Sequence, residues 1–323
     1  MSLPDHDHGA GDDSGSGAAE RAGVSALLAR HGYPVRSLRV LGAGLDHVAY
    51  DVDGRFVARV ARGAGDAERA RREARLLGRL AAASPLPVPA PELIDDAGDA
   101  ACLVYPRLPG TPLLDVPLLD VPAGPHGAAG VPTPVATRVG RALGGLLAVL
   151  HAEPVERWAD VVAPDDAAPA AWLPDAAEAY AAAVSHVPPE HRRSVETFLG
   201  AEPPPRASRL ALCHGDLGIE HVLVDARARV VTGIVDWSDA ALADPARDLG
   251  LVYRDLGRAG LQAALDARGC ATGDDAGLAE RVVFYARCGA LEDLAFGLAT
   301  GRRAYAAKSL AGLGRLFAAG RTT

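Results

Sequence analysis

Apolar and polar residues alternate over short runs in the first third of the chain, apart from one segment with helical spacing. Two strand-like runs cover 47–52 and 55–61, and the Asp53-Gly54 pair between them is a strong signal for a β-hairpin. Leucines recur at helical spacing over 66–80, which predicts an amphipathic helix. The pattern predicts a small sheet with one helix over about 35–110. Further elements expected here are a helix over 19–30 and strands over 38–41 and 101–105.

The rest of the chain has mostly helical spacing. Its clearest example is an apolar stripe that starts at Val135 and ends at Leu150. One β-rich island interrupts the pattern at 210–237, where the apolar runs 222–224 and 230–235 flank turn residues and should pair as a hairpin. The helices predicted in this part of the chain cover 135–150, 175–186, 189–199, 259–268, 277–299 and 303–318.

These patterns predict an α+β protein with two lobes. Residues 1–19 contain little to bury and are expected to form a disordered tail. We expect a small N-terminal β-sheet lobe with its hinge over 20–110, and a larger, mainly helical lobe with an embedded β-hairpin over 111–323. The segment 112–116 is repeated at once as 117–121, which we interpret as a local duplication in a loop.

Composition and charge narrow the range of partners. The net charge of -8 argues against a partner bound by neutralising phosphates, such as DNA or RNA. No apolar run is long enough to cross a bilayer, and the N-terminus lacks the basic start and apolar stretch of an export signal. We therefore expect a cytoplasmic monomer that binds neither nucleic acid nor membrane. The cysteines form no C-x-x-C pair and are interpreted as buried reduced thiols: Cys102, Cys213, Cys270 and Cys288.

Two charged residues stand out against this background. Glu73 lies on the apolar stripe of the helix over 66–80, where a carboxylate is costly unless it is paired. Glu73 should therefore meet a cation inside its lobe. Lys308 is the only lysine of the chain, so any mechanism that needs a lysine must use this residue.

The β-rich island carries the candidate chemistry. His221 and Asp236 stand at neighbouring ends of the predicted hairpin strands, so they should lie side by side, with Asp216 on the loop at the same end. Two carboxylates and an imidazole suit a divalent cation and a reacting hydroxyl. Alternatively, each residue is structural: Asp216 and Asp236 cap turns, and His221 is an ordinary polar residue. The joint order and spacing favour the functional interpretation.

With these motifs in this order, the sequence resembles the aminoglycoside and macrolide phosphotransferases over about 25–320. These are small-molecule kinases with the protein-kinase fold, so the resemblance implies a bilobal protein-kinase-like fold. It also implies that Asp216 accepts or orients the proton of the substrate hydroxyl and that His221 and Asp236 bind Mg²⁺. Many relatives have asparagine where this chain has His221, and histidine there is similar to the macrolide branch. In the segment that follows, Asp244 should cap a helix, and we interpret Asp248 as structural.

The resemblance also assigns roles in the N-terminal lobe. Gly42 and Gly44 look like part of the loop that covers the nucleotide. Arg59 falls where protein kinases carry the phosphate-contacting lysine, and Glu73 falls where their helix supplies its partner. Arginine keeps the charge and can bind phosphate and carboxylate through two donors. The segment from Tyr105 to Gly110 would be the hinge whose backbone reads the purine.

The implied function is an antibiotic O-phosphotransferase that confers resistance. It would move the γ-phosphate of GTP or ATP to a hydroxyl of a macrolide, because 44–47 and 235–240 look closer to the macrolide enzymes. An aminoglycoside or related cationic antibiotic is the alternative substrate, and a pseudokinase without transfer activity is a more remote alternative. A P-loop kinase and a metallophosphoesterase are disfavoured because the chain lacks Gly-Lys-Ser/Thr and Asp-x-His. Acids that could line an antibiotic pocket are Asp165, Asp166, Asp175, Glu178, Glu292 and Asp293.

Overall fold

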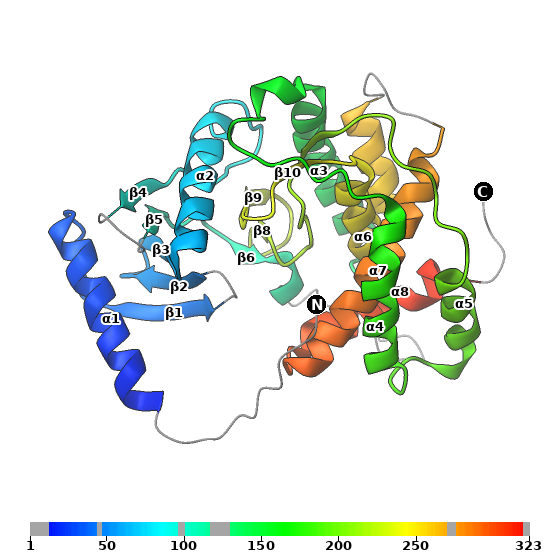
Figure 1. Cartoon of the computed structure of the whole chain (residues 1–323), viewed down its shortest axis with the longest axis horizontal. Coiled ribbons are helices and arrows are strands. Elements are labelled where there is room, and N and C mark those ends of the chain that lie inside the picture. Colours follow the sequence, from blue (N-terminus) through cyan, green and yellow to red (C-terminus); the bar gives the residue numbers. More distant parts are fainter. Residues whose placement is uncertain (1–12, 44–46, 96–100, 117–129, 270–275, 319–323) are drawn as a thin grey trace. The chain divides into compact units, whose positions relative to one another are not determined.

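The computed structural model describes residues 13–43, 47–95, 101–116, 130–269 and 276–318. The chain forms two compact units, which are described separately. The first comprises Met1–Ala74 and Ala90–Arg107, and the second comprises Arg75–Pro89 and Leu108–Thr323. The first unit contains an antiparallel sheet and the second is mainly helical, so the predicted α+β class is confirmed (Figure 1).

The first unit is built on a five-stranded antiparallel sheet with the order β1-β2-β3-β5-β4. The predicted hairpin is formed by β2 and β3, and Asp53 (φ 57°) and Gly54 (φ 70°) turn the chain in the left-handed region that these residue types tolerate. The strands are β1 (Leu38–Ala43), β2 (His47–Val52), β3 (Phe56–Ala61), β4 (Glu92–Asp95) and β5 (Ala101–Pro106). Of these, β4 is short and was not predicted.

Helix α1 (Asp13–Arg30) begins before Ala19, so the prediction of a disordered tail is wrong for 13–19, and 1–12 lie outside the described residues. The C-terminal half of α1 packs Leu28 into the core of the first unit, and Glu20 accepts a hydrogen bond of 2.9 Å from Tyr50. Helix formation is cooperative, so a packed half allows the helix to continue toward its N-terminus.

Helix α2 (Ala64–Leu80) contributes to both units. Its leucine stripe (Leu76, Leu77 and Leu80) is buried in the core of the second unit, together with Val88. The segment 75–89 therefore belongs with the helical unit, whereas the sequence pattern assigned all of 20–110 to the N-terminal lobe. The sequence shows that the stripe is buried, but it does not show which core buries it.

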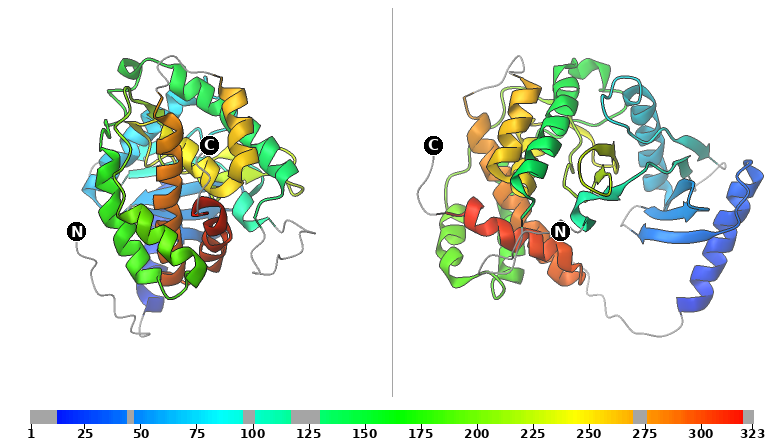
Figure 2. Two further views of the ribbon diagram at one scale, coloured as in Figure 1. Left: turned by 90° about the vertical axis from the view of Figure 1, so that its right-hand side faces the viewer. Right: turned by 180° about the vertical axis from the view of Figure 1, so that it is seen from behind.

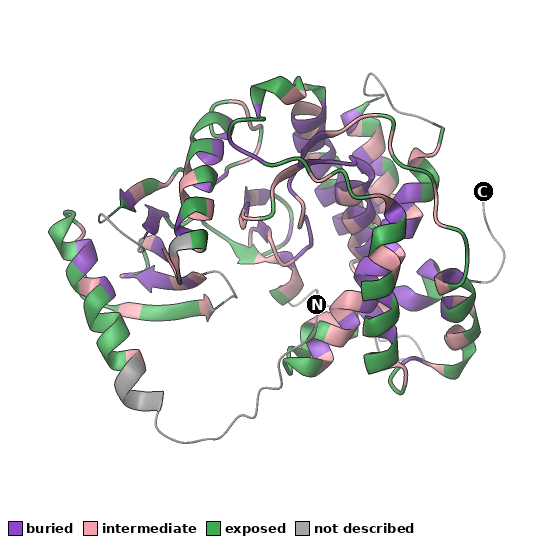
Figure 3. Cartoon of the chain, in the orientation of Figure 1, coloured by how far each residue is buried: buried purple, intermediate pink, exposed green. Residues whose placement is uncertain are grey.

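The second unit is organised around two helices, α3 (Thr133–Ala152) and α6 (Ala246–Arg268), which lie side by side (Figure 2). Added Cβ atoms on Gly140 and Gly144 would collide with the backbone of Gly260 and Ala264, so small residues permit the close approach. Buried residues concentrate where these helices pack (Figure 3). The remaining helices of the unit are α4 (Leu173–Ala183), α5 (Pro189–Leu199), α7 (Leu278–Ala299) and α8 (Arg303–Leu316), with short 3-10 turns at Leu113–Asp115, Val155–Arg157 and Pro169–Trp172.

Helix α6 is longer than the periodic pattern predicted. It begins at Ala246, and Gly257 interrupts it with φ 67°, so the predicted segment 259–268 is only its second half. The carboxylate of Asp244 accepts a hydrogen bond of 2.9 Å from the Ala246 N–H, as expected of a residue at a helix start. Among the described helices, none combines the length and apolar character needed to span a membrane.

The β-rich island of the second unit contains the predicted hairpin. Strands β8 (Val222–Val224) and β9 (Val231–Ile234) are antiparallel, with Val222 opposite Ile234. The beginning of the predicted β-rich island forms β7 (Ala211–Cys213). Two further strands were not predicted: β6 (Thr111–Pro112) pairs with β8, and β10 (Ala241–Ala243) pairs with β7. Strands of two or three residues are too short to show periodicity.

Candidate active site

The β8–β9 hairpin brings His221 and Asp236 together, as the sequence predicted. His221 directly precedes β8 and Asp236 follows β9, and the backbone N–H of Val235 donates to the His221 carbonyl at 3.0 Å. The His221 Nε2 lies 3.6 Å from the Asp236 Oδ2, and its Nδ1 lies 3.4 Å from the Asp216 Oδ2. The three side chains therefore form a row with the imidazole in the middle, which we call the catalytic row.

The hydrogen bonds of the row set the tautomer of His221. Its Nδ1 lies 2.8 Å from the Asp216 carbonyl oxygen, which can only accept, so the proton of the neutral ring is on Nδ1. The lone pair of Nε2 then faces Asp236. Burial alone would lower the pKa of His221, but the carboxylates of Asp216 and Asp236 raise it. A cation of either kind, a proton or a metal ion, is thus favoured between His221 and Asp236.

Asp216 has the environment of a general base. Burial raises the pKa of its carboxyl to about 6, and His221 acts in the opposite direction. Its side chain is 40% exposed, so the carboxylate is accessible from solvent. A carboxylate with a pKa close to the working pH accepts protons more effectively than an ordinary aspartate.

Asp236 is held in an unusual backbone conformation. Its φ is 65°, in the left-handed region that non-glycine residues rarely adopt, and the Ser238 Oγ donates to its Oδ1 at 3.0 Å. Aspartate tolerates this region better than most other residues, as at Asp53, so the conformation costs little.

A buried histidine, His214, and a buried aspartate, Asp248, support the start of the segment that links β7 to β8. Burial lowers the pKa of His214 to about 3, so the ring is neutral. Its Nε2 donates to the Val235 carbonyl at 3.1 Å, and its Nδ1 accepts from the Asp216 N–H at 3.2 Å. The carboxylate of Asp248 accepts from the N–H groups of His214 (2.8 Å) and Gly215 (3.0 Å). Asp248 is therefore structural, as predicted, and it supports the backbone that leads to Asp216.

Gly215 is required by the same loop. It has φ 86°, and an added Cβ would collide with the backbone carbonyl of Asp239. Any side chain at this position would push apart the two segments that carry Asp216 and Asp236.

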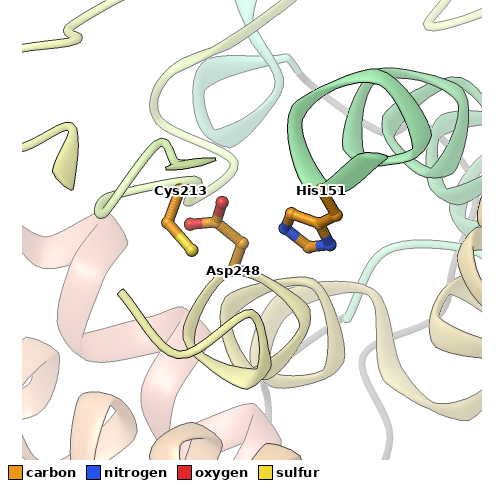
Figure 4. A group of neighbouring side chains, drawn as sticks. All are labelled: His151, Cys213 and Asp248. Carbon is orange, nitrogen blue, oxygen red and sulfur yellow. The ribbon is translucent and has the colours of Figure 1, made fainter. Parts of the chain in front are cut away.

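His151, Cys213 and Asp248 converge beneath the loop (Figure 4). Their potential ligand atoms lie within 4.8 Å of one another, but each has another role. Asp248 accepts two backbone N–H groups, and the His151 Nδ1 accepts a hydrogen bond of 2.9 Å from the Arg268 Nε. Burial raises the pKa of the Cys213 thiol well above its usual range, which opposes the thiolate that a metal needs. The cluster is a packed support for the segment that follows β7. Cys102, Cys213 and Cys288 are buried free thiols, as predicted, and Cys270 lies outside the described residues.

In the first unit, Arg59 of β3 and Glu73 of α2 form a buried ion pair through the Arg59 Nη1 and the Glu73 Oε1. Their side chains are 8% and 5% exposed. The second Nη of Arg59 lies 3.3 Å from the His47 Nδ1. Arg59 is thus the buried cation that Glu73 was predicted to need.

The other residues predicted to contact the nucleotide also lie in the first unit. Gly42 is in β1 at the shift of register against β2, and Tyr105 is buried in β5 opposite Val57. Gly44 lies outside the described residues. The roles of Gly42, Gly44 and Tyr105 in nucleotide binding therefore stay predictions.

Sequence reasoning missed Glu220, Arg254 and Asp255, which form a group of charged side chains next to His221 in the chain and in space. The Ile219 N–H donates to the Asp255 Oδ2 at 3.1 Å, and the Arg254 Nη2 lies 3.4 Å from the Glu220 Oε1. One signal was available: Lys308 was noted as the only lysine, and it belongs to the same group of charges.

Comparison with solved structures places this fold among phosphotransferases with a protein-kinase-like architecture. The GDP and kanamycin complex of APH(2")-IIia matches 92% of this chain and 98% of its own, with 21% identity and a TM-score of 0.66. Macrolide 2'-phosphotransferase MphH from Brachybacterium faecium matches 93% of this chain and 99% of its own, with 26% identity and a TM-score of 0.58. A macrolide 2'-phosphotransferase type I matches 91% and 97%, with 26% identity and a TM-score of 0.59.

The sequence itself agrees with this class. Residues 37–281 match the model of the Phosphotransferase enzyme family, so the chain belongs to that family. Among curated proteins it is 51% identical over 41 residues to the uncharacterized protein YcbJ of Bacillus subtilis (strain 168). That match spans only 13% of either chain.

Proposed function

We propose that the protein transfers the γ-phosphate of GTP or ATP to a hydroxyl group of a macrolide antibiotic and thereby confers resistance. The observation that carries the proposal is the catalytic row, in which His221 lies between the carboxylates of Asp216 and Asp236 at 3.4 Å and 3.6 Å. Membership of the phosphotransferase family and the GDP bound in the APH(2")-IIia complex support a nucleotide donor.

Asp216 has the role of proton acceptor in this proposal. The substrate hydroxyl donates its proton to the Asp216 carboxylate as its oxygen bonds to the γ-phosphorus. The bond between the γ-phosphorus and the bridging oxygen breaks, and the nucleoside diphosphate leaves with the electron pair. Little covalent chemistry is required of the protein, so positioning and charge stabilisation carry most of the effect.

The row offers a divalent cation one oxygen ligand, of the kind that Mg²⁺ prefers, and one nitrogen ligand. Asp236 offers a carboxylate oxygen, and the Nδ1–H of His221 is engaged by the Asp216 carbonyl, so Nε2 has its lone pair available on the Asp236 side. We assign His221 and Asp236 as the residues that would hold Mg²⁺. When bound, the ion would neutralise negative charge on the phosphates.

Arg59 is assigned to the upstream phosphates of the nucleotide, with Glu73 as its partner. The support is chemical: a guanidinium can hold a carboxylate with one edge and a phosphate with another, which a single ammonium does less well. The pairing with Glu73 fixes the direction of the guanidinium within the first unit.

The choice of a macrolide rests on the charges of the second unit. Aminoglycosides are polycations, whereas a macrolide of the erythromycin type offers a single amine. Two of the acids that could serve a polycation have cationic partners within the protein. The Asp293 Oδ2 lies 2.9 Å from the Lys308 Nζ and 2.9 Å from the Arg254 Nη1. Asp165 forms an ion pair with Arg247. Neutralised acids offer little to a polycation. His221 and the segment 235–240 also resemble the macrolide enzymes.

The test of the substrate is transfer of labelled phosphate from GTP and from ATP to erythromycin, kanamycin, streptomycin and hygromycin, with the products identified by mass. We expect a phosphorylated erythromycin. Transfer to one of the other three with none to erythromycin would assign a cationic antibiotic instead. Nucleotide binding without transfer to any acceptor would favour the pseudokinase.

The test of the mechanism is Asp216→Asn. Loss of the proton acceptor should lower kcat by about 10²–10⁴-fold, while the nucleotide Kd changes little because other residues hold the nucleotide and metal. Turnover within about tenfold of the wild type would contradict the assignment of Asp216. Asp266→Asn, which changes an exposed aspartate of α6 in the same unit, is the matched control and should leave kcat unchanged.

A further inference from the structure

A group of buried charges in the second unit lies next to the catalytic row. It contains two cations and three carboxylates, which we call the ion cluster: Glu220 from the loop before β8, Arg254 and Asp255 from α6, Asp293 from α7 and Lys308 from α8. Each of the five side chains is at most 15% exposed. Burying so many charges is costly unless their geometry is well satisfied.

Lys308 satisfies several of these carboxylates at once. Its Nζ lies 2.6 Å from the Glu220 Oε2, 2.9 Å from the Asp293 Oδ2 and 3.5 Å from the Asp255 Oδ2. An ammonium has three donors, and three carboxylates surround this one. Burial alone would lower the pKa of Lys308, but Asp255, Asp293 and Glu220 raise it, so the side chain remains charged.

The ion cluster contacts the catalytic loop at consecutive residues. Glu220 immediately precedes His221 and bonds to Lys308, and the N–H of Ile219 donates to Asp255 at 3.1 Å. An added Cβ on Gly218 would collide with the carboxylate of Glu220 and the guanidinium of Arg254. The three residues before His221 are therefore fitted to the cluster.

A shift of Glu220 would move the catalytic row. His221 is the next residue, and both of its ring nitrogens face carboxylates of the row. A displacement of about 1 Å in a catalytic group can reduce the rate about 10²-fold. Buried ion pairs are weak evidence for stability as such, because apolar residues of similar size often stabilise a protein as well. What such residues provide is a fixed position for the groups that they hold.

We propose that Lys308 is a positioning residue that acts through Glu220 to hold the loop 216–221 in the geometry of the catalytic row. The proposal deepens the phosphotransfer function proposed above and rests on it for the kinetic part of its test. Lys308 itself need not touch the nucleotide or the antibiotic.

The experiment compares four variants of the full chain with the wild type. Lys308→Met removes the charge but keeps a long side chain, and Lys308→Arg restores the charge. Glu220→Gln/Lys308→Met removes one charge of each sign. Arg303→Met is the matched control, because it removes a cation from an exposed position of the same helix, α8.

The kinetic measurement separates kcat from KM. We expect Lys308→Met to lower kcat by about 10- to 100-fold with both KM values within about threefold of the wild type, because misplacement affects the transition state more than substrate binding. Lys308→Arg should recover kcat to within about fivefold of the wild type, since it supplies donors to the same carboxylates. The double variant should lose no more kcat than Lys308→Met alone, because both substitutions act through one contact.

Hydrogen exchange measured by mass spectrometry gives a readout that is independent of activity. In Lys308→Met, peptides spanning 214–222 should exchange at least about tenfold faster than in the wild type, because the Ile219 N–H and its neighbours lose their support. Peptides spanning β2 and β3 should be unchanged, as should every peptide of Arg303→Met. If Lys308→Met does not fold, the double variant is measured in its place, with the same expected change in the loop.

Two results would overturn the positioning role. One is a folded Lys308→Met protein, or double variant, with kcat and loop exchange within about twofold of the wild type. The other is a loss in Lys308→Arg as large as that in Lys308→Met, which would show that the charge is not what matters. A wild-type protein without transfer to any acceptor would instead overturn the proposed function, and loop exchange would still decide whether Lys308 holds the loop.

Discussion

Two groups of buried charges, one in each unit, differ in their arrangement. In the first unit, one cation and one carboxylate, Arg59 and Glu73, face each other from β3 and α2. In the second unit, the ion cluster combines five charged side chains from three helices and a loop, with one more carboxylate than cations. The simple pair was predicted from the sequence, whereas the cluster was not.

The difference shows what each arrangement can do. A single pair sets the direction of one guanidinium, which suits a residue assigned to phosphate binding. A cluster whose members bond to several segments fixes those segments against one another. The pair therefore belongs to ligand binding in our proposal, and the cluster belongs to the geometry of the catalytic loop.

The largest expected effect comes from breaking the simple pair. Glu73→Ala leaves Arg59 buried without its carboxylate and should lower the free energy of unfolding by about 3–5 kcal/mol. Chemical denaturation followed by circular dichroism measures this loss. Glu68→Ala, in the exposed part of the same helix, is the control and should cost about 1 kcal/mol or less. Equal losses in the two variants would show that the Arg59–Glu73 pair is not a buried pair in solution.

Replacing the whole pair should separate stability from function. Arg59→Met/Glu73→Leu removes both charges. Its free energy of unfolding should lie within about 1–2 kcal/mol of the wild-type value, because no buried charge is left without a partner. Its affinity for GTP or ATP should fall at least about tenfold, as measured by calorimetry, if Arg59 contacts phosphate. Unchanged affinity in this stable variant would leave Arg59 with a structural role only.

A smaller effect is expected at the edge of the ion cluster. Glu292 is adjacent to Asp293, but within the described residues no hydrogen bond or ion pair of Glu292 is found, and burial raises the pKa of its carboxyl to about 7. A raised pKa stabilises the fold below the unfolded value and loses this contribution as the pH rises through about 7. Glu292→Gln should therefore gain about 1 kcal/mol over the wild type between pH 6 and pH 8.

The measurement is the free energy of unfolding of both proteins at several pH values. The control is Glu178→Gln, which changes an exposed glutamate of α4 and should leave the pH dependence as in the wild type. If the difference between Glu292→Gln and the wild type does not grow with pH, Glu292 has a counter-charge in solution, and the contrast with its paired neighbour Asp293 fails.

The smallest effect is expected at the N-terminus. Deletion of 1–12 should change neither the melting temperature nor turnover, because this segment has few apolar residues to contribute. Deletion of 1–30 is the contrasting variant: it removes Leu28 from the core of the first unit and should lower the melting temperature by several degrees. A clear loss on deleting 1–12 alone would show that these residues have a function.

Local sequence patterns determined much of the fold and the outline of the site. The alternation around Asp53-Gly54 and the leucine spacing of α2 identify their elements because both are short-range properties of the backbone. The spacing of Asp216, His221 and Asp236 around one hairpin predicted that they meet, since the pairing of two adjacent strands is also a local matter. The pairing of Glu73 with a cation was predictable because its carboxylate lies on the apolar stripe of a helix, where an unpaired charge is costly.

Only the tertiary structure decided which distant residues surround these local elements. Leu76 and Leu80 were predicted to be buried, but their assignment to the second unit depends on contacts with residues far away in the chain. Lys308 is 88 residues from Glu220, and no periodicity links a residue of α8 to a loop before β8. The sequence can show that a buried charge needs a partner, but the packing of the helices decides which residue becomes that partner. The sequence therefore specified the catalytic row, and the packing of α6, α7 and α8 supplied the ion cluster beside it.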